Sequence, residues 1–165
     1  MSKSLNILLY GYGNPGRKDD GLGPILVDLV EEWIIEHEIE NISIDSNYQL
    51  NIEDAYTIRD YDIVIFFDAS IEEIDDFIVS RIEPSDKVNY TMHSVSPSFV
   101  LNLCNKIYHY SPEAFLLHIK GYEFQLQEGL SEKANKNLES AFTFIKSLLV
   151  EPDKLVKNLS AQMPD

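Results

Sequence analysis

The sequence predicts a single α/β domain, in which a mostly parallel, twisted sheet of about five strands carries helices on both faces. Three observations lead to this prediction. Segments with strand and helix patterns alternate along the chain, as in proteins built from βαβ units. Residues 62–68, DIVIFFD, are apolar between their two aspartates, which is typical of a strand buried on both faces. The 165 residues suffice for one domain with a sizeable core.

The first half of the chain contains three strand patterns and two helix patterns. Residues 5–10 form a mostly apolar run that predicts the first strand. Apolar residues then recur at helical spacing from Ile25 to Ile34, which predicts a helix that ends near His37. The remaining elements of this half are a short strand at residues 42–45, a short helix at 52–59 and the strongly indicated strand at 62–68.

The second half continues the alternation. Residues 77–82 alternate less cleanly and predict an edge strand, and residues 114–119 predict another buried strand. Ser96 and Pro97 begin a helix, because serine is a favoured N-cap and proline fits the first turn. Ser131 begins a last amphipathic helix that continues to Leu149. We assign residues 1–150 to the folded domain, and residues 151–165 predict a mobile tail because their periodicity is weak.

The composition excludes several classes of function. The chain has 13 basic and 28 acidic residues, and its net charge of −15 repels nucleic acid and anionic lipid. No apolar run approaches the roughly 18 residues that span a bilayer, and the N-terminus lacks a signal-peptide pattern. The single cysteine, Cys104, lies on the apolar side of a predicted helix and is interpreted as a core thiol. We therefore expect a cytoplasmic protein without nucleic-acid or membrane partners.

The loop after the first strand, Gly11-Tyr12-Gly13-Asn14-Pro15-Gly16, is the most distinctive segment. Its glycines match a dinucleotide fingerprint, and Asp45 could serve as the ribose-binding acid. Several residues, including Asp19 and Asp20, separate these glycines from the helix and occupy the place of the phosphate. Asp45 is 29 positions past Gly16, whereas about 20 are expected. Dinucleotide binding is therefore the weaker interpretation, and helix capping is an ordinary alternative role for the two aspartates.

Two carboxylates and one imidazole are expected at the same edge of the sheet. Asp20 follows the first strand, Asp68 ends the third, and His93 lies in a loop just before a helix. Loops at the carboxyl ends of parallel strands converge, and this set of ligands suits a divalent cation such as Ni, Zn or Fe. Each residue alone also has an ordinary explanation, namely capping for an aspartate and solvation for a loop histidine. Nucleophilic alternatives are poor, because no Gly-x-Ser-x-Gly elbow occurs.

The same residues resemble a known family, the hydrogenase maturation proteases, which trim the C-terminus of nickel–iron hydrogenase large subunits. The resemblance begins with Gly11-x-Gly13-Asn14 and Asp19-Asp20-Gly21-x-Gly23. It continues through Asp68-Ala69, His93-Ser94, Gly121-Tyr122-Glu123-Phe124 and Glu128-Gly129-Leu130-Ser131, and so spans residues 5–149.

The resemblance implies an endopeptidase that removes a C-terminal peptide from the nickel-loaded large-subunit precursor. Carried over by position, the catalytic and metal-binding residues are Asp20, Asp68 and His93, and Asp19 has a structural or capping role. The position of Asp20 is often Glu in relatives, and either acid can bind a cation. Gly11, Gly13 and Asn14 would form the loop of the substrate cleft. The nickel would be supplied by the substrate, with no organic cofactor. A non-catalytic metal-recognition or chaperone module for the same partner is the alternative.

Overall fold

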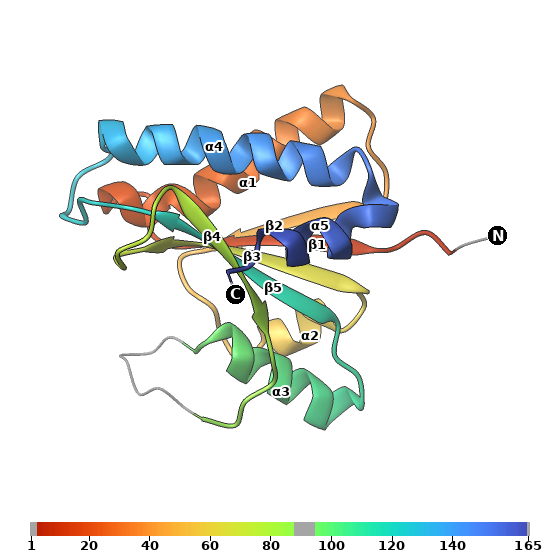
Figure 1. Cartoon of the computed structure of the whole chain (residues 1–165). Helices are drawn as coiled ribbons and strands as arrows, with labels where there is room; N and C mark the ends of the chain where they lie inside the picture. Colours follow the sequence, from red (N-terminus) through yellow and green to blue (C-terminus); the bar gives the residue numbers. More distant parts are fainter. Residues whose placement is uncertain (1–2, 88–94, 165) are drawn as a thin grey trace.

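The computed structural model describes residues 3–87 and 95–164 and contains a five-stranded sheet between two layers of helices (Figure 1). The order of the strands is β2-β1-β3-β5-β4, and all neighbouring pairs are parallel except β5 with the edge strand β4. The strands are β1 (Ile7–Tyr12), β2 (Ile42–Asn47), β3 (Ile63–Ser70), β4 (Phe77–Ile82) and β5 (Glu113–Lys120). The helices are η1 (Lys18–Gly21), α1 (Leu22–Glu36), α2 (Asp54–Ile58), α3 (Pro97–Tyr108), α4 (Glu132–Leu149), η2 (Pro152–Lys154) and α5 (Leu155–Gln162).

The helices form two separate cores with the sheet. α1, α4 and α5 cover one face, and α2 and α3 cover the other (Figure 1). Alternate residues of β3 enter different cores: Ile65 and Phe67 pack on the first, whereas Val64 and Phe66 pack on the second. The strand is therefore apolar without a break because both of its faces are buried, as the sequence predicted. The predicted fold class is confirmed.

The helix starts follow the expected capping chemistry. The hydroxyl of Ser96 accepts a hydrogen bond from the backbone N–H of Phe99 and caps α3, and Pro97 is its first residue. The hydroxyl of Ser131 accepts from the N–H of Ala134 and caps α4. Cys104, a residue of α3, is fully buried, as expected for a core thiol.

Within the described part of the chain up to residue 164, the structure has helices where the sequence predicted a mobile tail at residues 151–165. Residues 152–162 form η2 and α5, and α5 packs against α4 and β4. Leu155 and Leu159 are fully buried in the first core. These two leucines are four positions apart and therefore share one helix face. The few apolar residues of this segment are irregularly spaced and show no clear period in the sequence, and the burial of the two leucines depends on a surface formed by distant residues.

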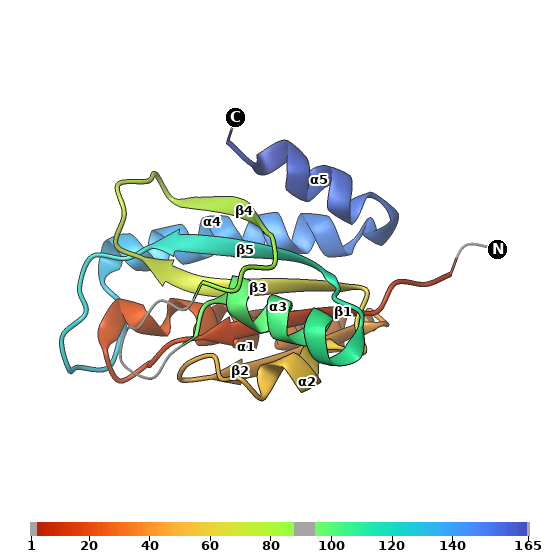
Figure 2. The same cartoon turned by 90° about the horizontal axis from the view of Figure 1, so that it is seen from below.

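The topology brings several loops to one edge of the sheet. The carboxyl ends of β1, β3 and β5 point the same way, toward the left in Figure 2. The glycine loop follows β1, residues 48–53 follow β2, residues 71–76 follow β3 and residues 121–131 follow β5. This is the edge at which open α/β sheets place their ligand sites. No helix among the described residues is long and apolar enough to cross a membrane.

Candidate functional site

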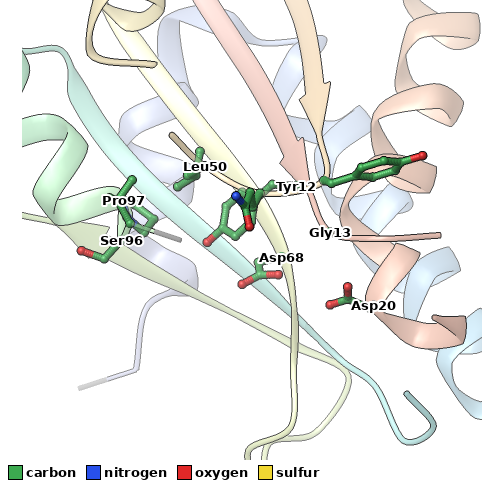
Figure 3. A pocket seen from close by; sticks show the side chains of 10 residues that line it. Tyr12, Gly13, Asp20, Leu50, Asp68, Ser96 and Pro97 are labelled. Carbon is green, nitrogen blue, oxygen red and sulfur yellow. The ribbon is translucent and has the colours of Figure 1, made fainter. Parts of the chain in front are cut away.

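A pocket of about 420 Å³ opens at the carboxyl edge of the sheet (Figure 3). Asp20 and Asp68 both line it, and Figure 3 shows their carboxylates facing the same space. The other lining residues come from the ends of β1 and β2 and from the start of α3: Tyr12, Gly13, Tyr48, Gln49, Leu50, Val95, Ser96 and Pro97. The site therefore joins residues far apart in sequence, as expected for the carboxyl ends of parallel strands.

The carboxylate of Asp68 has its acidity altered by the pocket. It lies near the end of β3, where the strand leaves the core, and its side chain is only partly exposed. Burial raises the pKa of Asp68 from 3.8 to about 7, and the nearby charge of Asp20 acts in the same direction. Hydrogen bonds from the Tyr12 hydroxyl and the Ala69 backbone N–H oppose the rise but do not cancel it. Asp68 can therefore gain or lose a proton near neutral pH.

Asp20 reaches the pocket from the short helix η1. Its Oδ2 accepts a hydrogen bond of 2.8 Å from the backbone N–H of Asn14, which ties the acid to the glycine loop. Gly13 has a φ of 140°, and a Cβ at this position would overlap the backbone oxygen of Asp20. Only glycine fits here, so the loop can fold closely around η1 and leave the carboxylate of Asp20 directed into the pocket (Figure 3).

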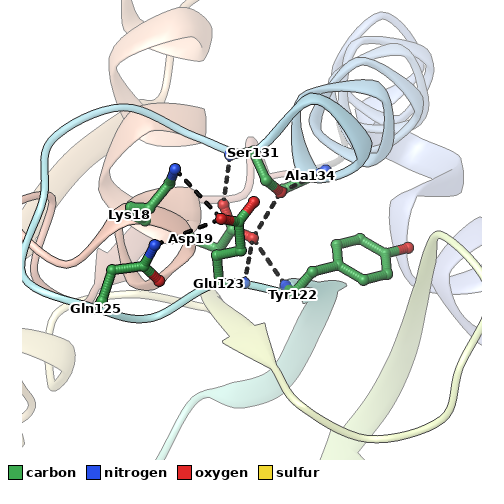
Figure 4. Close-up of polar contacts among 7 residues, drawn as sticks. All are labelled: Lys18, Asp19, Tyr122, Glu123, Gln125, Ser131 and Ala134. Carbon is green, nitrogen blue, oxygen red and sulfur yellow. Dashed lines mark hydrogen bonds and ion pairs between the residues drawn. The ribbon is translucent and has the colours of Figure 1, made fainter.

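Asp19, the neighbour of Asp20, has a structural role. It is fully buried, and its carboxylate accepts hydrogen bonds from the backbone N–H groups of Tyr122, Glu123 and Ser131 and from the Ser131 hydroxyl, at 2.7 to 2.9 Å (Figure 4). Burial alone would raise the pKa of Asp19, but these hydrogen bonds outweigh it and lower the pKa below its ordinary value. Asp19 does not cap its own helix. It fastens residues 121–131 to η1.

Backbone hydrogen bonds strengthen this connection. The N–H of Lys18 donates to the Gln127 oxygen at 2.8 Å, and the N–H of Gln127 donates to the Gly16 oxygen at 3.0 Å. The side chain of Arg17 donates to the Phe124 oxygen, and Lys18 lies 3.4 Å from Glu123. The segment from Gly121 to Ser131, expected to matter from the resemblance alone, therefore supports both the glycine loop and the helix η1 that carries Asp20.

The remaining predicted site residues have mixed outcomes. Gly13 lines the pocket and Asn14 holds Asp20, whereas Gly11 lies away from the pocket. A Cβ on Gly11 would meet Val27 at 2.6 Å and overlap the backbone of Gly23, so Gly11 allows α1 to pack closely on β1. His93 lies outside the described residues.

The described residues bring two carboxylates into the pocket, without a third acid, a histidine or a cysteine beside them. Among residues 3–87 and 95–164, no three His, Cys, Asp or Glu side chains form a group that could hold a metal ion. Within this part of the chain, the pocket offers the two carboxylates of Asp20 and Asp68.

Sequence reasoning missed Tyr12, whose hydroxyl bonds to Asp68. Burial and the charge of Asp68 raise the pKa of Tyr12 well above its ordinary value, so the hydroxyl keeps its proton and acts as a donor. Tyr12 is the last residue of β1. Its position at the carboxyl end of a strand is the feature from which the sequence could have identified it as a site residue.

The structure gives no support to the dinucleotide interpretation. The carboxylate of Asp20, rather than an open anion site, faces the backbone of the glycine loop. Asp45 lies within β2 and its Oδ1 accepts a hydrogen bond from the N–H of Ser46.

Comparisons of the sequence with protein-family models and with curated proteins found no match. Solved structures do match over nearly the whole chain. A [NiFe] hydrogenase maturation protease, HycI from Thermococcus kodakarensis, has a TM-score of 0.71 at 21% identity, covering 91% of this chain and 96% of its own. The hydrogenase maturating endopeptidase HybD from E. coli has a TM-score of 0.65 at 18% identity, covering 90% and 94%.

A hydrogenase 2 maturation peptidase from a Thaumarchaeota archaeon has a TM-score of 0.63 at 22% identity, covering 87% of this chain and 97% of its own. Identities in this range establish similarity of fold. For the fold, the resemblance inferred from the sequence motifs is thus confirmed. The chain has the fold of the hydrogenase maturation proteases.

Proposed function

We propose that this protein is a cytoplasmic endopeptidase that removes a C-terminal peptide from the nickel-loaded large-subunit precursor of a nickel–iron hydrogenase. The observation that carries the proposal is the meeting of Asp20, in η1, and Asp68, in β3, in one pocket. Both acids belong to the segments in which the family motifs occur. The solved structures with this fold include proteins named as hydrogenase maturation endopeptidases, which supports the same activity here.

Asp20 and Asp68 are proposed to engage the nickel that the substrate carries, and no organic cofactor is required. Carboxylate oxygens are acceptable ligands for such a cation, and two of them leave positions open for groups of the substrate. His93 is proposed as the third protein ligand. Ser96, three positions after His93, lines the pocket, which supports this assignment. When bound, the cation would polarise the scissile carbonyl or an attacking water.

The residues of the chain would prepare the site for this reaction. Asp68, with its pKa near 7, can hold a proton in the free enzyme and release it as a cation approaches. The Tyr12 hydroxyl donates to Asp68 and fixes its orientation. Asp19 acts through its neighbour, because it holds η1 and so keeps Asp20 directed into the pocket.

The test is to incubate the protein with its nickel-loaded large-subunit precursor and to measure the intact mass of the precursor. The expected result is one shortening at the C-terminus, which the variants Asp20→Asn and Asp68→Asn abolish. Asp60→Asn, which removes an exposed carboxylate after α2, is the matched control and should cleave normally. Full cleavage by both pocket variants would contradict the assignment of the site.

The same experiment separates the alternatives. Stable binding of the precursor without any change in its mass would favour a non-catalytic metal-recognition or chaperone module. If neither binding nor cleavage occurred, a calorimetric titration with NAD that released heat would favour the dinucleotide-binding interpretation instead.

A further inference from the structure

The three large hydrophobic side chains that are most exposed among the described residues lie on loops at one edge of the sheet. Leu126 is 84% exposed, Ile71 76% and Tyr48 72%. They belong to three loops, which we name after the strands that they follow: the β5 loop (residues 121–131), the β3 loop (71–76) and the β2 loop (48–53). All three loops lie at the carboxyl edge, on the left in Figure 2. Single exposed hydrophobic residues are common, but here the most exposed ones share the edge that holds the pocket.

Each of these loops is held in place by a buried ionisable side chain. Lys120 donates from its Nζ to the backbone oxygen of Ile71 at 3.1 Å, in the β3 loop. Asp54 accepts from the backbone N–H of Asn51 at 2.8 Å, in the β2 loop, and Asp19 holds the β5 loop as described above. Apart from tyrosine, every buried polar or charged residue that the structure describes bonds to or lies in one of these loops: Asp19, Asp54, Ser70, Lys120 and Ser131. Hydrogen bonds of buried groups are costly to break, so the loops present their apolar side chains in fixed positions.

The loops adjoin the pocket but extend beyond it. Tyr48 lines the pocket, Ile71 is three positions after Asp68, and the β5 loop is bonded to η1, which carries Asp20. β1 and β3 lie between β2 and β5, so the loops spread over about 14 Å of the edge, or three strand spacings. Ile71 and Leu126 are not among the residues that line the pocket. A peptide seated in the pocket would leave these two side chains uncovered, whereas the body of the protein that presents the peptide would lie against them.

The charge of the three loops is negative. They contain seven acidic residues, namely one in the β2 loop, four in the β3 loop and two in the β5 loop, and no lysine, arginine or histidine. Glu73 and Glu123 lie within 4 Å of Lys120 and Lys18, which are outside the loops. The other five acids leave a negative surface around the exposed hydrophobic side chains. A matching partner therefore has an apolar contact region with basic residues around it.

We propose that the tips of these loops form a docking surface for the folded body of the large-subunit precursor, outside the peptide that enters the pocket. The identity of the partner rests on the proposed function. Ile71 and Leu126 would be buried on the partner, and the acids around them would face its basic residues. Because the loops are held in place before binding, little conformational freedom is lost when the two proteins meet. The surface would thus recognise the precursor as a folded protein, separately from its metal and its C-terminal peptide.

The experiment compares two double variants of the full chain. Ile71→Ala/Leu126→Ala removes the proposed contacts. Ile35→Ala/Ile107→Ala is the matched control, because both isoleucines are exposed and lie near the ends of α1 and α3, on the right in Figure 1 and away from the loops. Binding of the nickel-loaded precursor is measured by biolayer interferometry with Asp68→Asn added to every protein, so that the precursor stays intact. Cleavage is measured without Asp68→Asn.

The first double variant should weaken binding of the precursor about tenfold or more, since truncation of central apolar contacts has effects of this size. It should also raise KM and leave kcat unchanged, because neither residue lines the pocket. The control variant should match wild type in binding and cleavage. Association of the wild-type surface should slow as salt is added, because the two surfaces are oppositely charged. Equal thermal midpoints of both variants and wild type would show that any loss is not a loss of folding.

Several results would overturn the docking surface. These are unchanged binding in Ile71→Ala/Leu126→Ala, an equal loss in the control, and an association rate that does not depend on salt. A synthetic peptide with the C-terminal sequence of the precursor that bound as tightly as the precursor would refute recognition of the folded body. Sedimentation of wild type as a dimer and of the first variant as a monomer would assign the surface to a second copy of this chain instead. If the wild-type protein bound the precursor through these residues but never shortened it, the proposed function would fail while the docking surface stood.

Discussion

Asparagine in place of Asp68 should make the folded protein more stable above neutral pH. The carboxyl of Asp68 has its pKa raised by burial from 3.8 to about 7. A group whose pKa is higher in the folded state contributes its full stability below its ordinary pKa, and this contribution is lost as the pH rises toward 7. Asparagine keeps a similar shape and an acceptor for Tyr12 but does not ionise. The variant therefore avoids the cost of a charge in the pocket.

The size of the effect follows from the two pKa values. Each tenfold change in an ionisation constant corresponds to about 1.4 kcal/mol, so the rise from 3.8 to about 7 corresponds to at most about 4 kcal/mol. Solvent that reaches the partly exposed carboxylate lowers this figure. We expect equal stabilities of Asp68→Asn and wild type near pH 4, and a growing advantage of the variant up to about pH 7.5.

The assay is urea denaturation at pH 4, 5.5, 7 and 8.5, which gives the free energy of unfolding of both proteins. Asp75→Asn is the control, because Asp75 is an exposed aspartate in the loop after β3 and should show no such trend. A constant difference between Asp68→Asn and wild type at all four pH values would refute the argument. The variant should nevertheless lose cleavage, so stability and activity would change in opposite directions.

Three further predictions concern the elements that hold the site. Asp19→Asn should lower the free energy of unfolding by about 3 kcal/mol at pH 7, since a buried acceptor of several N–H groups loses its charge. Because the pKa of Asp19 is lowered, its contribution is present above the ordinary value and lost as the pH falls, so urea denaturation at pH 3 should show a smaller difference. Gly13→Ala should cost about 2 kcal/mol or more, because of its positive φ and the overlap with Asp20, and a normal thermal midpoint would contradict this. Leu159→Ala should cost about 2–5 kcal/mol through the cavity left under α5, whereas a mobile tail would show no loss on denaturation.

Most of the fold could be predicted because the apolar pattern of each segment matches the faces that the segment buries in the structure. The run in β3 is apolar on both faces, and both faces are covered by helices. Ser96 and Ser131 were identified as helix starts from capping chemistry, and both make the expected hydrogen bonds. α5 was missed because Leu155 and Leu159 become buried only against α4 and β4, which are formed by distant parts of the chain.

The candidate site could be predicted in part. A general rule of parallel sheets places Asp20 and Asp68 at one edge, and the structure brings both to one pocket. The different directions of Asp19 and Asp20 could not be deduced locally, because the partners of Asp19 are more than 100 positions away. The sequence placed Tyr12 in the glycine loop without a role, and its hydrogen bond is visible only once Asp68 lies beside it.

The most direct measurement is a crystal structure of the protein soaked with Ni²⁺ or Cd²⁺. Our account predicts one cation in the pocket, within bonding distance of carboxylate oxygens of Asp20 and Asp68 and of a ring nitrogen of His93. A cation bound elsewhere, or a histidine at position 93 directed away from the two aspartates, would contradict the claim that these three residues form one site.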